Sequence, residues 1–433
     1  MIPHGMFFRK GIMMDKIVIE GGFPLNGEIS ISGAKNSAIK LMAVSLLTDQ
    51  PVKLKNMPRL RDTRSMAELL THLGVKINAG KGDEMTLHAK KLTSTTAPYD
   101  LVRKMRASFN VLGPLIARNG SAKVSLPGGC AIGARPVDLH LKAMESFGAI
   151  IKLEEGYVIA KTSGGLKGAD ITFPFISVGA TEHAILTAVL AKGETVLNNA
   201  AREPEIIDLA DCLNAMGAKI TGAGRSEIRI KGVSSLKGVT HSVVPDRIEA
   251  GTYALAAATS GGSVRLTNIR SDHLGSLWPL IAQAGAKVSL DETSVLIERG
   301  GGRPKAVDVD TQAYPGFPTD LQAQFMALMC HADGVSIIRE NIFENRFMHC
   351  PELSRMGADI TVTGREAIVR GVKELIGAPV MATDLRASAS LINARLAARG
   401  ETHVGRVYHL DRGFEHIEKK LGQCGANIRR EKE

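Results

Sequence analysis

Aromatic side chains and long apolar runs are scarce in this sequence, and each absence excludes a class of protein. Aromatic residues make up 4% of the chain and include a single Trp. Proteins that bind single-stranded nucleic acid need more aromatic platforms for base stacking, so we expect no nucleic-acid partner. No apolar run approaches the roughly 20 residues that a membrane-spanning helix requires, so we expect no membrane span.

Cysteine is also rare. The five cysteines are odd in number, and no C-x-x-C pair occurs. Few, scattered cysteines in a long chain fit a reducing compartment. The neighbouring Cys and His at 330–331 and 349–350 match no zinc-site spacing. The first 16 residues, MIPHGMFFRKGIMMDK, have no apolar core of a signal peptide. We therefore expect a cytoplasmic protein with no metal site.

Two common phosphate-binding signatures are missing as well. Neither GxGxxG nor GxxxxGK[ST] occurs, which argues against a Rossmann dinucleotide site and a P-loop. Positive charge, in contrast, is in excess: 54 Lys and Arg against 44 Asp and Glu give a net charge of +10. A basic protein attracts anions. With so few aromatic residues, a small polyanionic ligand explains this charge better than nucleic acid does.

One phrase recurs six times along the chain: an amphipathic helix, then Gly, then a β-rich run. The glycines follow one another at intervals of 74, 69, 68, 72 and 68 residues, and they are Gly74, Gly148, Gly217, Gly285, Gly357 and Gly425. Gly directly after a helix permits the left-handed C-cap. An apolar helix and a strand-forming run precede each phrase. The sequence therefore predicts six repeats of about 70 residues, each with one helix apolar nearly all round and buried.

The repeats predict an α/β (α+β) layer packing with three repeats in each domain and a boundary near residues 235–246. A short strand at 16–20 precedes the first repeat. The pattern alone leaves open whether this strand pairs with the nearer domain or with the farther one.

The segment 125–140, SLPGGCAIGARPVDLH, combines a dense run of glycines with one cysteine. Glycines let the backbone bend tightly and approach a ligand closely. Cys130 has Arg135 nearby and a predicted helix start close behind, and such surroundings favour a thiolate. The alternative is a turn whose cysteine only packs in the interior.

Each apolar helix is entered through a polar phrase that carries Ser, Thr, Asp or a cation. Cations at a helix start oppose the helix dipole, so a bound anion would explain them, and they are Lys35, Arg106, Arg247 and Arg386. Asp246, Asp320 and Asp384 are candidate bases, although Asp at a helix start is also an ordinary cap. If the repeats surround a common axis, the helix starts converge on one site.

With these residues in view, the sequence resembles the enolpyruvyl transferases from about Met14 to the C-terminus. The resemblance rests on SGAKN, MRAS, PGGCAIGARPVDLH, AAREPEI, PDRIE, FPTDLQAQF, ENRFMH and ATDLRAS, which occur in this order. It implies a two-domain inside-out α/β barrel with three repeats per domain. The implied domains are 1–34 together with 245–433, and 35–244, so that the N-terminal strand joins the C-terminal repeats. Substrates would bind between them, without a cofactor.

The resemblance implies transfer of the enolpyruvyl group of phosphoenolpyruvate to the 3-hydroxyl of UDP-N-acetylglucosamine, with release of phosphate, in peptidoglycan synthesis. The reaction would be an addition followed by an elimination. Cys130 would be the general acid on the methylene carbon of phosphoenolpyruvate, could form a covalent adduct with it, and would be alkylated by fosfomycin. Asp320 would accept the hydroxyl proton, with Lys35 and Arg412 as further catalytic groups.

The implied binding residues fall into two sets. Phosphoenolpyruvate would contact Lys35, Asn36, Arg135, Arg386 and Arg412. UDP-N-acetylglucosamine would contact Arg106, Arg135, Pro136, Val137, Asp138, Leu139, Ser177, Val178, Gly179, Asp320 and Ile342.

One departure from the family pattern concerns Phe175, which stands where many members carry Lys. A cationic contact to the nucleotide is therefore expected to be missing. Two other functions remain open. The first is transfer to shikimate 3-phosphate, whose enzymes lack the cysteine loop. The second is a basic, non-catalytic binding protein for UDP-sugars or RNA.

Overall fold

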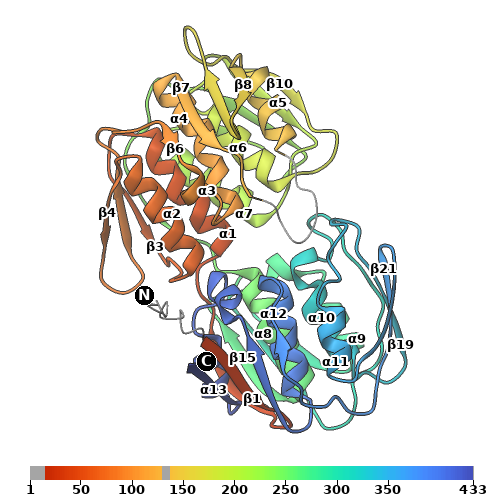
Figure 1. Cartoon of the computed structure of the whole chain (residues 1–433). Helices are drawn as coiled ribbons and strands as arrows, with labels where there is room; N and C mark the ends of the chain where they lie inside the picture. Colours follow the sequence, from red (N-terminus) through yellow and green to blue (C-terminus); the bar gives the residue numbers. More distant parts are fainter. Residues whose placement is uncertain (1–14, 129–136, 433) are drawn as a thin grey trace, which may run out of the picture.

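The computed structural model describes residues 15–128 and 137–432 (Figure 1). Its buried apolar residues form two separate cores. One core is drawn from residues 34–243 and the other from residues 17–31 together with 248–424. We call the corresponding parts the N-terminal half (residues 34–243) and the C-terminal half (residues 15–31 and 248–432). They form the upper and lower lobes of Figure 1.

The described part of the N-terminal half contains twelve strands: β3 (Val52–Lys55), β4 (Lys76–Ala79), β5 (Met85–His88), β6 (Thr96–Ala97), β7 (Ser121–Ser125), β8 (Ile150–Glu154), β9 (Tyr157–Lys161), β10 (Asp170–Thr172), β11 (Glu194–Asn198), β12 (Lys219–Thr221), β13 (Glu227–Lys231) and β14 (Val239–Ser242). Its described helices are α1 (Lys35–Val44), α2 (Arg61–His72), α3 (Tyr99–Val102), α4 (Leu112–Asn119), α5 (Asp138–Ser146), α6 (Val178–Ala188) and α7 (Pro204–Ala215), with 3-10 turns η1 (Ser45–Leu47) and η2 (Arg106–Val111).

The C-terminal half repeats this composition. Its strands are β1 (Asp15–Glu20), β2 (Leu25–Ser30), β15 (Gly262–Thr267), β16 (Lys287–Leu290), β17 (Ser294–Arg299), β18 (Val309–Asp310), β19 (Val335–Arg339), β20 (Asp359–Thr363), β21 (Glu366–Arg370), β22 (Val380–Met381), β23 (Glu401–Gly405) and β24 (Asn427–Lys432). Its helices are α8 (Arg247–Ser260), α9 (Trp278–Gln283), α10 (Gln322–Met329), α11 (Cys350–Arg355), α12 (Leu385–Leu396) and α13 (Ile417–Gln423), with 3-10 turns η3 (Ser271–Leu274), η4 (Thr319–Leu321) and η5 (Val407–Arg412).

The six predicted repeats are confirmed. The described strands form six four-stranded sheets, one for each repeat. The six recurring glycines, which we call the marker glycines, each follow the amphipathic helix of their repeat, which we call its outer helix. Their φ angles lie between 87° and 102°, where a side chain would be strained. The apolar helix of each repeat, which we call its inner helix, lies at the centre of each half. In the order of the repeats the inner helices are α1, α4, α6, α8, α10 and α12, and all 12 residues of α12 are buried. Helices inside and sheets outside confirm the predicted inside-out α/β fold.

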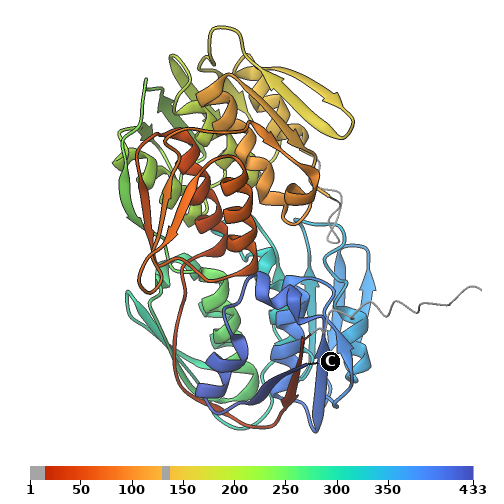
Figure 2. The ribbon, with the colours of Figure 1, turned by 60° about the vertical axis from the view of Figure 1, so that its left-hand side comes forward.

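Three sheets are completed by a strand from a distant part of the chain. β14 runs parallel to β3, and β2 runs parallel to β15. β1 lies between β23 and β24 and is antiparallel to both. In Figure 2 this dark red strand lies within the lower lobe beside the C-terminus. The N-terminal strand therefore pairs with the last repeat, which answers the question that its sequence left open.

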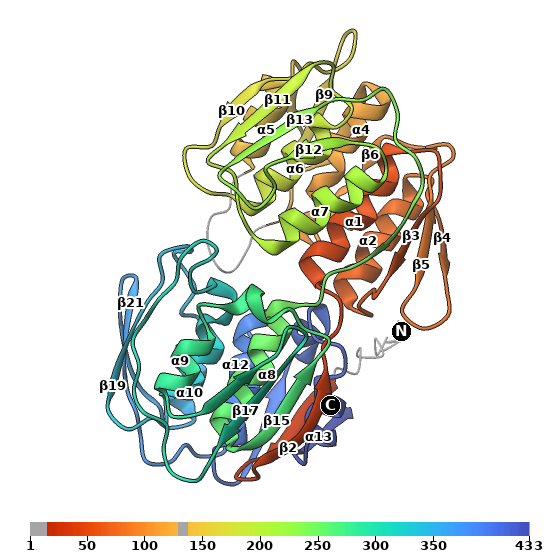
Figure 3. The same cartoon turned by 180° about the vertical axis from the view of Figure 1, so that it is seen from behind.

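Two connections, residues 31–35 and 243–247, join the halves and run side by side (Figure 3). Gly33 and Pro245 form an antiparallel bridge, and the Ala34 N–H donates to the Val244 carbonyl at 2.7 Å. A side chain at Gly33 would place its Cβ 1.8 Å from the Asn56 carbonyl oxygen, so only glycine fits here. None of the helices in the two described ranges combines the length and apolar composition that crossing a bilayer requires.

Candidate functional site

The predicted cations do stand at helix starts. Lys35 and Arg247 are the first residues of α1 and α8, Arg106 opens η2, and Arg386 is the second residue of α12. Each faces the positive end of its own helix dipole, which is unfavourable unless a negative charge lies close by. The structure shows these negative charges for Lys35, Arg247 and Arg386.

Lys35, Asp62 and Arg412 form the first cluster, which we call the Asp62 cluster. The Lys35 ammonium lies 3.2 Å from Asp62 Oδ2, and Arg412 Nε donates to Asp62 Oδ1 at 2.9 Å. Lys35 and Asp62 belong to the N-terminal half, whereas Arg412 ends η5 in the C-terminal half. One carboxylate whose side chain is only 3% exposed thus bridges the halves and holds two cations together.

The charges of the Asp62 cluster shift one another's proton affinity. Burial raises the pKa of Asp62, but Lys35 and Arg412 outweigh it, so that this pKa is lowered overall. Burial lowers the pKa of Lys35, and although Asp62 opposes this, Arg386 and Arg412 lower it further. The cluster therefore carries one more positive charge than negative, which suits it to a further anion such as a phosphate.

Asp320, Arg346 and Arg386 form the second cluster, which we call the Asp320 cluster. Arg346 Nη2 donates to Asp320 Oδ1 and Arg386 Nη2 to Asp320 Oδ2, both at 2.6 Å. Burial raises the pKa of Asp320, but the two guanidinium groups outweigh burial and hold it far below its usual range. Asp320 is the second residue of η4, whose N-cap is Pro318, and in the described part of the chain its carboxylate oxygens accept from Arg346 and Arg386 and not from a backbone N–H. The alternative that Asp320 is an ordinary helix cap is therefore wrong.

The two clusters lie within electrostatic range of each other. Asp320 raises the pKa of Lys35, and Lys35 lowers that of Asp320. The starts of the first, fifth and sixth inner helices are thereby brought together, as the convergence of helix starts predicted. A ligand that spans both clusters would meet a row of cations with an anionic acceptor, Asp320, beside it.

Two of the candidate bases, Asp246 and Asp384, lie at the starts of α8 and α12. Asp246 caps α8 by accepting from the Ile248 and Glu249 N–H groups, and Asp384 caps α12 in the same way through the Arg386 and Ala387 N–H groups. These two candidate bases therefore act as caps.

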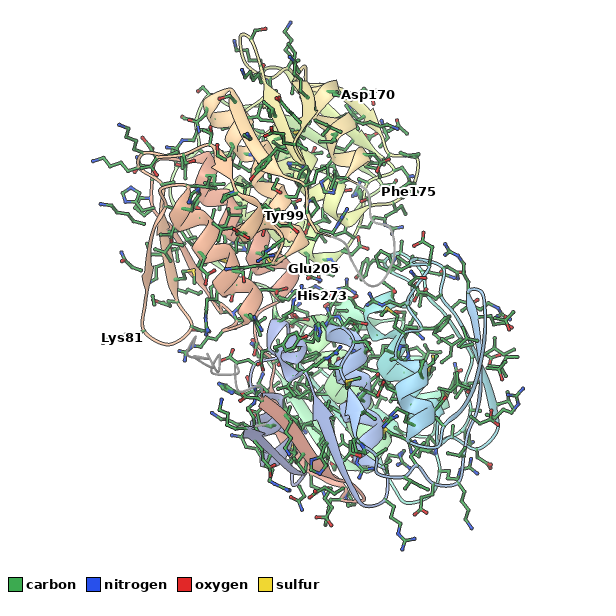
Figure 4. All side chains as sticks on the ribbon, viewed as in Figure 1. Lys81, Tyr99, Asp170, Phe175, Glu205 and His273 are labelled. Carbon is green, nitrogen blue, oxygen red and sulfur yellow. The ribbon has the colours of Figure 1, made fainter. Side chains whose placement is uncertain are left out.

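Arg247 pairs with Glu205 of the N-terminal half at 3.0 Å. Figure 4 shows Glu205 at the boundary between the halves, with His273 nearby. This second ion pair across the boundary explains the cation at the start of α8 without a bound anion.

The remaining predicted site residues divide into several groups. Cys130, Arg135 and Pro136 lie outside the described residues. Val137 precedes α5, which Asp138 and Leu139 begin. Ser177 caps α6 by accepting from the Ala180 N–H at 3.4 Å, and Val178 and Gly179 are the first residues of that helix. Asn36 is partly buried beside Lys35.

Gly179 and Ile342 are each placed by a buried neighbour. A Cβ on Gly179 would lie 3.4 Å from His140 Cε1, so the start of α6 faces the imidazole of α5 closely. The Ile342 N–H donates to Glu340 at 2.9 Å, and Glu340 also accepts from Thr319 Oγ1 at 2.9 Å. Thr319 precedes Asp320, so that Glu340 fixes the Ile342 turn relative to the Asp320 cluster.

Sequence analysis did not single out three buried polar side chains. Asp62 stands alone in α2 without a motif, and only its contacts identify it. Arg346 lies inside ENRFMH, one of the motifs that carry the family resemblance, but nothing in this motif singles out the arginine. His183 accepts from the Gly113 N–H at 2.8 Å and faces His140 with an Nδ1–Nδ1 distance of 2.9 Å. Burial lowers the pKa of His183 to about 3, so His183 is neutral.

Comparison with known proteins agrees with this geometry. The family model described as EPSP synthase (3-phosphoshikimate 1-carboxyvinyltransferase) matches residues 19–421. A UDP-N-acetylglucosamine 1-carboxyvinyltransferase from Caulobacter sp. (strain K31) is 66% identical, with 96% of this chain and 97% of that protein covered. One of the same name from Maricaulis maris (strain MCS10) is 64% identical, with 96% and 99% covered.

Two solved structures share the architecture. The enolpyruvyl transferase NikO from Streptomyces tendae superposes with a TM-score of 0.87 at 27% identity, covering 97% of this chain and 100% of that one. EPSP synthase from Acinetobacter baumannii superposes with a TM-score of 0.74 at 18% identity, covering 96% and 100%, which supports the fold alone. Six repeats, the inside-out halves and a family match over nearly the whole length lead to one conclusion: the chain belongs to the EPSP synthase family.

Proposed function

We propose that the protein transfers the enolpyruvyl group of phosphoenolpyruvate to the 3-hydroxyl of UDP-N-acetylglucosamine and releases phosphate, as the first committed step of peptidoglycan synthesis. The identity of 66% over 420 residues to a protein named for this reaction carries the proposal. The Asp62 and Asp320 clusters support it physically. Each holds two cations, and the lowered pKa of Asp320 keeps this carboxylate charged and able to accept a proton.

The Asp62 cluster is the proposed site of the phosphoenolpyruvate phosphate. Lys35 and Arg412 reach it from opposite halves, so a phosphate bound between them would draw the halves together. Arg135, which the family resemblance adds to this site, lies outside the described residues. Arg386 and Asn36, which follows Lys35 in the chain, are the proposed contacts for the carboxylate of phosphoenolpyruvate.

Asp320 is the proposed acceptor of the sugar 3-hydroxyl proton. Its lowered pKa makes it a weak base, so it orients the hydroxyl and takes the proton late, as the new bond forms. Each Asp320 oxygen accepts one bond from an arginine and keeps a second lone pair for the hydroxyl. Arg346 and Arg386 also stabilise negative charge that develops on the attacking oxygen.

The chemistry proceeds in two balanced steps. In the addition, the sugar oxygen bonds to C2 of phosphoenolpyruvate while Cys130 delivers a proton to C3. In the elimination, C3 returns a proton to the Cys130 thiolate, the double bond forms again and the C2–O bond to phosphate breaks, while the proton taken up by Asp320 passes to the departing phosphate. The role of Cys130, including its covalent adduct and its alkylation by fosfomycin, rests on the family resemblance.

The nucleotide-sugar is proposed to lie along the starts of α5 and α6 and the turn at Ile342, with Arg106 as a further contact. This places it between residues 35–244 and the unit formed by 1–34 and 245–433, which we propose as the two functional domains. Phe175, which is 58% exposed on the N-terminal half, would leave this site without one cation (Figure 4). Such an enzyme would work in the cytoplasm, where both substrates are made.

The direct test incubates the purified protein with phosphoenolpyruvate and UDP-N-acetylglucosamine. Mass spectrometry should detect the enolpyruvyl nucleotide-sugar, and phosphate should be released in equal amount. Shikimate 3-phosphate, offered in a parallel reaction, should release none. Product from shikimate 3-phosphate alone, or binding of the nucleotide-sugar without any phosphate release, would overturn the proposal.

A further inference from the structure

Asp246 lies where the two halves are joined, at the end of the second connection. Its side chain, in a residue only 8% exposed, makes hydrogen bonds in two directions. Oδ1 accepts from the Ile248 N–H at 2.8 Å and from the Glu249 N–H at 3.0 Å, which caps α8 of the C-terminal half. Oδ2 accepts from the Lys35 N–H at 3.0 Å, at the first residue of α1 in the N-terminal half.

Helix α1 needs this contact because it lacks a cap of its own. The residue before it, Ala34, offers no side-chain acceptor, and the first turn of α1 contains no acidic residue. The helix instead begins with the cation Lys35, which is unfavourable at the positive end of the dipole. Asp246, from the neighbouring connection, supplies the negative charge and the acceptor that the sequence of α1 does not.

We propose that Asp246 is a cap shared by two helices and thereby a positioning residue for Lys35. The inference deepens the proposed function, because it concerns a residue of the proposed phosphoenolpyruvate site. The backbone of Lys35 is held to the start of α8, and so to the half that contributes Arg412. The distance between the Lys35 ammonium and the Arg412 guanidinium then depends on the Asp246 carboxylate, although this carboxylate contacts neither of the two side-chain charges.

The backbone around Asp246 fixes this arrangement from both sides. The Asp246 N–H donates to the Ser32 carbonyl at 2.9 Å, and the Ser32 N–H donates to Glu249 at 2.7 Å. Lys420 donates to Glu249 at 2.8 Å and to Ser32 Oγ at 2.9 Å. The first connection is thus held to α8 immediately before it enters α1, which leaves the Asp246–Lys35 bond as the last link.

Asp246→Asn tests the shared cap because it separates the two contacts. Asn caps α8 as well as Asp does, but the amide nitrogen that replaces Oδ2 is a donor and cannot accept from the Lys35 N–H. Asp246→Ser also caps α8 and is too short to reach Lys35. In both variants we expect hydrogen exchange to accelerate in a peptide covering residues 33–38 and to stay unchanged at the start of α8.

The kinetic expectation follows from losing one charged hydrogen bond. kcat/KM for phosphoenolpyruvate should fall about tenfold to a hundredfold, whereas the Kd of UDP-N-acetylglucosamine should change less than about twofold. Ser32→Ala is the matched control: it removes only the Lys420–Ser32 Oγ bond and keeps the backbone bonds of Ser32, the Lys420–Glu249 bond and the Asp246–Lys35 bond. It should behave as the unaltered protein in both measurements.

Three results would overturn the proposal. Exchange at residues 33–38 that is unchanged in both variants would show that Asp246 does not hold α1. A fall in kcat with unchanged exchange would make Asp246 a group that acts on the substrate directly. An equal loss of affinity for the nucleotide-sugar would indicate a general loosening of the fold. The exchange experiment needs no substrate, so it remains decisive even if the unaltered protein fails to transfer an enolpyruvyl group.

Discussion

The Asp62 and Asp320 clusters are built alike, each with one carboxylate between two cations, yet they differ in where their members come from and how open they are. The Asp62 cluster joins both halves, and the Asp62 side chain is 3% exposed. The Asp320 cluster belongs to the C-terminal half alone, and the Asp320 side chain is 25% exposed. The two clusters therefore share a charge arrangement but differ in how much of the carboxylate a substrate could reach.

Under the proposed function, the accessibility of each carboxylate separates the two roles. Asp62 has almost no surface on which to meet a substrate, so it can only arrange Lys35 and Arg412 for an anion that arrives from outside. Asp320 retains surface, so it can accept a hydrogen bond from a hydroxyl while its arginines keep it charged. If this contrast is correct, removing each charge should damage a different property of the protein.

The largest effect is expected for Asp320→Asn. The variant loses the negative charge that accepts the hydroxyl proton, so kcat should fall by roughly 10²–10⁴. The protein should still fold, because Asp320 caps no helix and the Asn oxygen can still accept from one of the two buried arginines, although loss of their counter-charge should lower the Tm. Steady-state kinetics with a thermal-unfolding control measure both properties. A near-normal kcat would remove Asp320 from the chemistry and erase the contrast.

Asp62→Asn should instead damage stability first. Breaking a buried ion pair by removing one partner typically costs about 3–5 kcal/mol, and here Lys35 and Arg412 are left to repel each other. Added inorganic phosphate should relieve that repulsion, so it should raise the Tm of this variant more than that of the unaltered protein. Asp320→Asn serves as the matched comparison, and an equal phosphate shift in both variants would contradict a special role for Asp62.

Acid should leave both clusters intact and act elsewhere. The folded-state pKa values of Asp62 and Asp320 are lowered, so their stabilisation is lost only below about pH 4. His183, with a pKa of about 3, stays neutral in the folded protein while the unfolded chain gains a proton below about pH 6.5. Its contribution to stability is therefore lost as the pH falls from about 6.5.

The histidine effect can be isolated with His183→Gln. Between pH 7.5 and 5.0 the free energy of unfolding, from urea titration, should fall by about 2 kcal/mol less in the variant than in the unaltered protein. The glutamine oxygen can still accept from the Gly113 N–H. Equal pH dependence in the two proteins would place the acid sensitivity outside this pair.

The smallest effect is expected at Phe175, on the nucleotide side of the proposed site. Phe175→Lys should lower the Kd of UDP-N-acetylglucosamine about two- to fivefold, the strength of a solvent-exposed ion pair. The KM of phosphoenolpyruvate should not change, because both clusters are untouched. Titration calorimetry at low and high salt provides the check, since a gain that persists unchanged at high salt would not be electrostatic.

The repeats were predictable from sequence because their determinants are local. The left-handed conformation of all six marker glycines follows from one helix end each, and the inner helices follow from their continuous apolar composition. The pattern of the residues did not predict the exchange of β1, β2 and β14 between repeats, because strands of four to six residues carry no information about a partner hundreds of residues away, and only the family resemblance indicated where β1 pairs.

The same reasoning separates the site residues. Lys35, Arg386 and Asp320 could be selected because a cation or carboxylate at a helix start is unusual or informative by itself. Asp62 could not, because an Asp in the first turn of an amphipathic helix is the commonest arrangement there is. Its importance comes from Arg412, 350 positions along the chain, and no local pattern records that distance.

The place of β1 has a consequence for how the protein is made. The N-terminal half is one continuous stretch, so it can fold while the rest of the chain is still being translated. β1, whose Ile17, Val18 and Ile19 end up fully buried, must wait for β24, about 400 residues later. At roughly 5–20 residues per second this delay lasts roughly 20–80 s. Among the described strands, β1 is therefore synthesised first and pairs last, and it stays open to wrong pairing for longest.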